Sequence, residues 1–156
     1  MSKNMHPLDE SLLPWIGKTT KALDHFITEM FASCGIQLTK AQFILLRVLA
    51  KHEGIKQNDL ASFASREKTT LARLLTTMEK KNLVYRKGSD TDKRTNLVFI
   101  SPQGKEELDK AIPALVESLQ LIQSGITKKE LSITLGVLQR IRKNINADEF
   151  SIPCKH

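Results

Sequence analysis

The segment between residues 66 and 80 places cationic and hydroxyl side chains at a regular spacing. Its members are three or four residues apart: Arg66, Thr69, Arg73, Thr76 and Lys80. At 3.6 residues per turn, this spacing puts all five on one side of a helix. Arg can donate two hydrogen bonds to the edge of a guanine, and Thr can hydrogen-bond to a base or contact a methyl group. The pattern fits either a helix face that reads the major groove of duplex DNA or an ordinary solvated face.

The opposite side of the same helix is apolar and carries Leu71, Leu74, Leu75 and Met78. A helix with this division packs its apolar side on a core and exposes the other. Lys68 and Thr70 flank the polar side, and we expect them to contact phosphate. The partial positive charge at a helix N-terminus would assist phosphate binding at this end.

A hairpin is predicted directly after this helix. Residues 83–86 and 97–100 are rich in β-branched and aromatic side chains, and the ten residues between them are polar. Lys93 and Arg94 at the tip are suited to the minor groove or its edge. Asp92 is expected to position Arg94 by a charge-assisted hydrogen bond rather than to approach phosphate.

Two more cations, Arg86 and Lys87, lie at the base of this hairpin. Both are candidates for phosphate contacts. For Arg86 an alternative stays open, in which its guanidinium pairs with Asp59 or Glu79 inside the fold.

Apolar periodicity predicts helices at residues 8–32, 39–54, 56–63 and 66–81, a fifth that begins at Ser101 and a last one after Thr127. Together with the hairpin, the order predicts a mainly α protein with a winged helix-turn-helix and a two-stranded β-wing. We expect a single domain over residues 1–156. Its DNA-binding lobe would span about 36–105, and helices in about 8–34 and 105–146 would form a dimerisation region, because their apolar faces exceed what the lobe can cover.

The charge of the chain agrees with a polyanionic partner. The net charge is +7, and residues 51–105 hold twelve Lys/Arg against six Asp/Glu. Nucleic acid is the first candidate and an anionic membrane surface the second. Few aromatics argue against stacking on single strands. No segment resembles a membrane span or a signal peptide, so we expect a cytoplasmic protein.

Several motifs in this region resemble those of the MarR family of bacterial transcriptional regulators. They are Met78-Glu79-Lys80-Lys81-Asn82-Leu83-Val84 after the recognition helix, Asp92-Lys93-Arg94 in the wing and Ile100-Ser101-Pro102-Gln103-Gly104 after it. Asn82 and Ser101 stand where the family has Gly and Thr. The resemblance implies a homodimer that binds a palindromic operator in duplex DNA. It further implies a repressor that a small phenolic or anionic effector releases, or, in a subset, a regulator that senses oxidants through a cysteine.

The candidates for a sensor are few. Trp15, His25, Phe31 and Phe43 would line an effector pocket or simply pack in the core. Cys34 would be a redox switch or a small buried apolar residue. No spacing typical of metal ligands, of phosphate-binding loops or of catalytic motifs occurs, so we expect no metal, no cofactor and no enzyme activity. The other functional class is a winged-helix module that binds proteins and not DNA.

Overall fold

The computed structural model describes residue 8 and residues 10–52, 54–63, 68–91 and 94–145 of the 156-residue chain. Its helices are α1 (Leu12–Ser33), α2 (Lys40–Lys51), α3 (Gln57–Phe63), α4 (Lys68–Lys80), α5 (Pro102–Ile122) and α6 (Lys128–Asn144). Its strands are β1 (Ile55–Lys56), β2 (Val84–Gly88) and β3 (Asn96–Ile100). The mainly α winged-helix fold is therefore confirmed.

Local hydrogen bonds set the helix ends. Thr39 and Thr127 each accept a bond from the backbone N–H three residues on, and the side chains of Gln42 and Glu130 accept one in return from the cap backbone. Such reciprocal capping satisfies amide groups that have no partner within the helix. After α4, Asn82 takes a left-handed conformation with φ 58°, which turns the chain into β2.

The sheet has three antiparallel strands in the order β1-β3-β2, not the two that the sequence predicts. Ile55 pairs with Val98 and Lys56 with Leu97, so Lys56 lies in a strand and not in a helix. A two-residue strand has no recognisable alternation of its own. Its partner is more than forty residues away, and only the folded chain supplies it.

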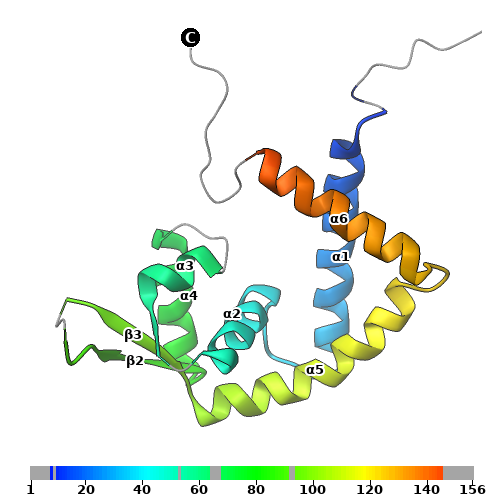
Figure 1. Cartoon of the computed structure of the whole chain (residues 1–156). Coiled ribbons are helices and arrows are strands. Elements are labelled where there is room, and N and C mark those ends of the chain that lie inside the picture. The colour runs from blue at the N-terminus through cyan, green and yellow to red at the C-terminus, as the bar shows by residue number, and fades with distance from the viewer. Residues whose placement is uncertain (1–7, 9, 53, 64–67, 92–93, 146–156) are drawn as a thin grey trace, which may run out of the picture.

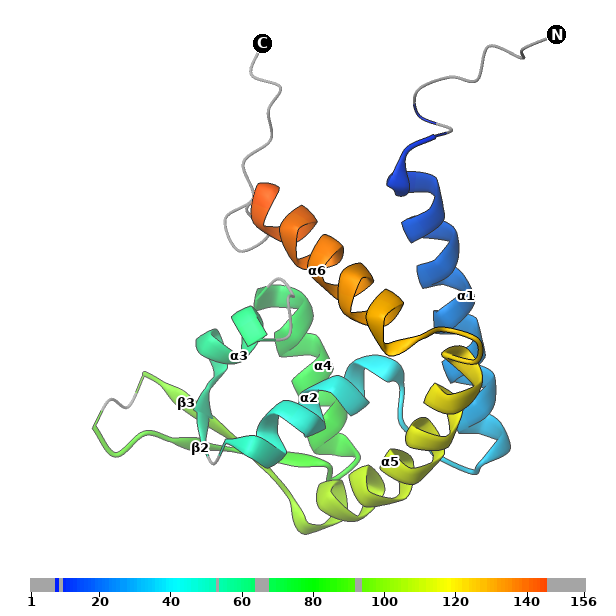
Figure 2. The same ribbon diagram turned by 45° about the vertical axis from the view of Figure 1, so that its right-hand side comes forward.

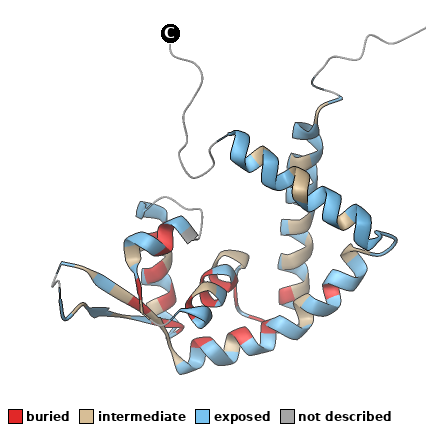
Figure 3. Cartoon of the chain, viewed as in Figure 1, coloured by how far each residue is buried: buried red, intermediate tan, exposed pale blue. Residues whose placement is uncertain are grey.

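The core lies in the lobe formed by α2, α3, α4, the sheet and the first half of α5 (Figure 3). The largest fully buried side chains are Leu45, Leu46, Leu49, Leu60, Leu71, Leu75, Met78 and Val98. Leu108 and Ala111 of α5 and Phe31 of α1 join this cluster. The second half of α5, with α1 and α6, forms an arm beside the lobe (Figure 1).

The arm leaves apolar side chains uncovered. As the excess of apolar surface predicts, α6 has no buried residue within a single chain. Leu135, Leu138 and Ile145 are each at least 40% exposed. The physical reason is geometric, because α6 and the N-terminal part of α1 diverge from each other and extend away from the lobe (Figure 2). None of the helices described is both long and apolar enough to cross a membrane.

Candidate nucleic-acid interface

Helix α4 divides into two sides. Leu71, Leu75 and Met78 are fully buried, and Leu74 is half-buried. The opposite side is exposed to solvent and carries Lys68, Thr69, Thr70, Arg73, Thr76 and Lys80. The predicted division of this helix is therefore confirmed. Arg66 lies outside the residues that the structure describes.

Two hydroxyl groups of α4 are already engaged. Thr76 donates to the carbonyl of Ala72 at 3.0 Å, and Thr77 donates to that of Arg73 at 3.1 Å. A Thr hydroxyl that donates to its own helix can still accept a hydrogen bond. Thr76 therefore presents a methyl group and an acceptor to a partner, whereas Arg73 presents only donors.

The hairpin β2–β3 projects from the lobe on the side away from α1 (Figure 1). Tyr85 and Phe99 stack across its two strands, with ring centroids 5.2 Å apart and planes 7° from parallel. This pair stiffens the base of the wing. Lys87 and Arg94 are exposed, and Asp92 and Lys93 lie outside the described residues.

A small polar groove joins the wing to the helix-turn-helix. Its volume is about 150 Å³, and it is lined by Gln57, Asn58, Arg94, Thr95 and Asn96. The start of α3 and the wing thus share one hydrophilic surface. Sequence reasoning missed this adjacency, because it depends on the tertiary contact between α3 and β3.

Arg86 is not directed at solvent alone. Its Nε and Nη2 donate to the two carboxylate oxygens of Glu79, at 2.9 and 2.5 Å. The hydrogen bond from Arg86 lowers the pKa of Glu79, and the bond to Glu79 raises the pKa of Arg86. Of the alternatives for Arg86, the structure contains the ion pair with Glu79.

The chain is similar to known regulators over most of its length. The MarR family model matches residues 38–95, which contain the helix-turn-helix and much of the wing. Transcriptional regulator HosA of Escherichia coli O111:H- is 40% identical over 110 residues, which is 70% of this chain and 79% of HosA. The chain belongs to the MarR family of transcriptional regulators.

Solved structures of MarR-type regulators have the same fold. A SlyA-like transcription regulator from Listeria monocytogenes superimposes with a TM-score of 0.75 at 28% identity, over 88% of this chain and 90% of that one. The transcriptional repressor CouR, solved bound to a 23-mer DNA duplex, has a TM-score of 0.80 at 20% identity, over 90% of this chain and 99% of that one. The second likeness concerns the fold alone.

The four residues predicted for an effector site of this MarR regulator do not come together within one chain. Phe31 and Phe43 are buried and meet edge to face, with centroids 5.8 Å apart. Trp15 is 65% exposed and has the Lys18 ammonium 5.4 Å from its ring centroid. His25 is exposed on α1. The two Phe side chains are thus core residues, and the other two lie on the uncovered arm.

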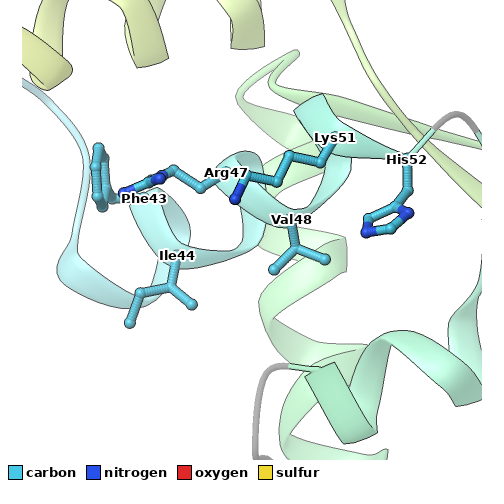
Figure 4. Close-up of a pocket in the computed structure, with 6 residues that line it drawn as sticks. All are labelled: Phe43, Ile44, Arg47, Val48, Lys51 and His52. Carbon is cyan, nitrogen blue, oxygen red and sulfur yellow. The ribbon is translucent and has the colours of Figure 1, made fainter. Parts of the chain in front are cut away.

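A different groove of about 390 Å³ lies along α2 (Figure 4). Its lining residues are Phe43, Ile44, Arg47, Val48, Lys51 and His52. Only Phe43 was among the predicted residues. The missed signal was on α2 itself, where Ile44 and Val48 alternate with Arg47 and Lys51 at helical spacing. An apolar floor with two cations suits a small amphipathic anion.

Cys34 follows the end of α1 and is exposed, so its prediction as a small buried residue is wrong. It lies at the C-cap of α1, directly before Gly35, whose φ is positive. Among the described residues, no group of His, Cys, Asp and Glu side chains could hold a metal ion.

Proposed function

We propose that this MarR-family protein is a homodimer that binds a palindromic operator in duplex DNA and represses transcription until a small anionic effector releases it. The exposed cationic side of α4, fixed by buried leucines on the other side, is the observation that carries this proposal. Arg73 would reach base edges, and Lys68, Thr69 and Thr70 would contact bases or phosphate near the start of the helix.

The wing supplies the second contact. Arg94 and Lys87 would lie along the minor groove or its phosphates, next to the major groove that α4 enters. Cations at these positions add sequence-independent affinity that falls with salt. Asp92 and Lys93 keep their predicted roles as a positioning carboxylate and a second wing cation.

The uncovered arm supports the homodimer. Exposed apolar side chains on α1, α5 and α6, among them Trp15, Leu119 and Leu138, would be buried by a second copy related by two-fold symmetry. Two copies of α4 would then read half-sites about 34–36 Å apart, one turn of the duplex. The dimerisation helices would occupy residues of about 8–34 and 105–146. The DNA-binding lobe would occupy about 36–105.

The effector part of the proposal rests on the α2 groove. Arg47 and Lys51 would hold a carboxylate or phenolate, and Ile44 and Val48 would contact its apolar part. Trp15 and His25 would line the same site only if the partner subunit brings them there. Binding next to α2 would bias the position of the lobe relative to the arm, which is how an effector can change DNA affinity.

The experiment begins by selecting bound fragments of the source genome with the purified protein. Operator and random duplexes are then titrated with wild type, Arg73→Ala and Lys129→Ala, the last being an exposed cation near the start of α6. We expect Arg73→Ala to lose about 1–3 kcal/mol of operator affinity and most of the discrimination. Lys129→Ala should bind as wild type. Equal binding by all three proteins contradicts the assignment of α4.

A second titration adds aromatic carboxylates and phenols to the operator complex. Release by wild type that is lost in Arg47→Ala supports the groove. Release that persists in Arg47→Ala places the effector elsewhere. Peroxide treatment of wild type and Cys34→Ser decides the redox alternative, because a cysteine sensor loses operator binding only in the wild type.

A further inference from the structure

The guanidinium of Arg86 connects three elements of the proposed DNA-binding surface. Arg86 on β2 donates from Nε and Nη2 to both carboxylate oxygens of Glu79 on α4. Its Nη1 also donates to Oε1 of Gln57, the first residue of α3, at 3.4 Å. The wing, the recognition helix and the helix before it are therefore linked through a single side chain.

The environment makes this link stronger than a surface ion pair. The side chains of Arg86 and Glu79 are only 26% and 30% exposed. Partial burial reduces screening by water and salt, and a bidentate pair fixes distance and orientation together. The pKa directions of both groups agree with a charged pair.

We propose that Glu79, Arg86 and Gln57, here called the wing clamp, position the wing relative to α4 for DNA binding without touching DNA themselves. This inference rests on the proposed function. Besides the clamp, Val84 of β2 is buried in the core and β3 pairs with β1, which holds the base of the wing to the lobe. The clamp fixes the orientation of the wing relative to α4, and without it that orientation would have to be set during binding, at a cost in affinity.

The direction in which one substitution changes DNA affinity distinguishes this positioning role from a simple effect of charge. Glu79→Gln keeps the size of the side chain but removes a negative charge beside the DNA-binding surface. Charge alone predicts tighter binding to DNA. The wing clamp predicts operator binding weaker by about tenfold, which corresponds to about 1.4 kcal/mol. Binding to random duplex, which tolerates a displaced wing, should change less.

A matched control comes from α5, where Glu107 accepts a hydrogen bond from Lys110 at 2.8 Å. Glu107→Gln removes the same charge and also breaks an ion pair, but it lies outside the wing and α4. It should bind the operator as tightly as wild type or slightly tighter. Thermal unfolding of each variant shows that the folded fraction at the assay temperature is unchanged.

Two further variants test that the clamp acts through the wing. The exchange Glu79→Arg with Arg86→Glu restores an ion pair and should bind the operator better than either single variant. A direct phosphate contact by Arg86 would instead leave the exchange as weak as Arg86→Glu. In a double-mutant cycle, Glu79→Gln should reduce the effect of Arg94→Ala, because a displaced wing no longer uses Arg94.

The affinities of these variants for the operator decide between the wing clamp and its alternatives. Operator binding that weakens in Glu79→Gln, recovers in the exchange and couples to Arg94 supports the wing clamp. Wild type that binds its operator while Glu79→Gln binds equally well or better overturns the clamp and leaves the proposed function intact. If the wild type binds no duplex at low salt, both the wing clamp and the proposed function are overturned.

Discussion

Gly104 offers a stability prediction that follows from a single close contact. It is buried in the first turn of α5, against the chain that enters the wing. A Cβ at this position would lie 2.1 Å from the carbonyl oxygen of Leu83 and 3.0 Å from Cγ1 of Ile100. To reach 3.0 Å, below which real Cβ atoms essentially never come, the two backbone segments must separate by about 0.9 Å.

That separation disrupts existing hydrogen bonds. The carbonyl of Leu83 accepts a bond from the N–H of Ser101 at 3.1 Å, and the hydroxyl of Ser101 donates to the carbonyl of Asn82. Overpacking costs about 1–3 kcal/mol and a weakened buried hydrogen bond about 1 kcal/mol. The higher helix propensity of Ala relative to Gly stabilises the folded protein by less than about 1 kcal/mol. We therefore expect Gly104→Ala to lower the free energy of unfolding by about 2 kcal/mol.

Urea unfolding at fixed protein concentration measures this change, and the corresponding decrease in Tm is about 4–8 °C. Gly17→Ala is the matched control, because Gly17 lies inside α1 and a Cβ there meets nothing within 4 Å. It should leave stability unchanged or raise it by up to about 1 kcal/mol. A Gly104→Ala protein as stable as Gly17→Ala would refute the reasoning from the contact.

Three further predictions concern pH, assembly and a turn. The hydrogen bond from Arg86 lowers the pKa of Glu79 below its ordinary value of 4.5, so the pair stabilises the fold above that value. Between about pH 6 and pH 3, wild type should lose more free energy of unfolding than Glu79→Gln, and parallel curves would contradict this. Leu138→Glu should sediment as a monomer and should no longer bind operator in a titration. The neighbouring Gln139→Glu should sediment as a dimer. Asn82→Ala should lose about 1 kcal/mol of stability because φ is positive there, and Asn82→Gly should stay within about 0.5 kcal/mol of wild type.

The exposed side of α4 could be predicted from the local sequence pattern. The spacing of Thr69, Arg73 and Thr76 fixes their common side, because helical geometry depends only on neighbours three and four residues away. The burial of Leu71 and Leu75 on the other side follows from the same periodicity. Neither the resemblance nor the spacing, however, places the wing relative to this helix.

The residues predicted for an effector site show where sequence reasoning fails. Phe31 and Phe43 were candidates for an effector pocket or for the core, and the edge-to-face packing between α1 and α2 puts them in the core. The groove is instead formed by the outer side of α2, whose exposure depends on which other helices cover it. Cys34 is exposed although Phe31, three residues earlier, is in the core, so burial near the end of α1 depends on which side each residue takes.

The sequence by itself determined the helices, the caps at Thr39 and Thr127, the left-handed turn at Asn82 and the two sides of α4. Each of these depends on hydrogen bonds or contacts within about four residues. The tertiary structure alone decided that Arg86 pairs with Glu79 and that Ile55 and Lys56 form a third strand. These features join residues brought together by strand register and helix packing, and such contacts leave no periodic signal along the chain.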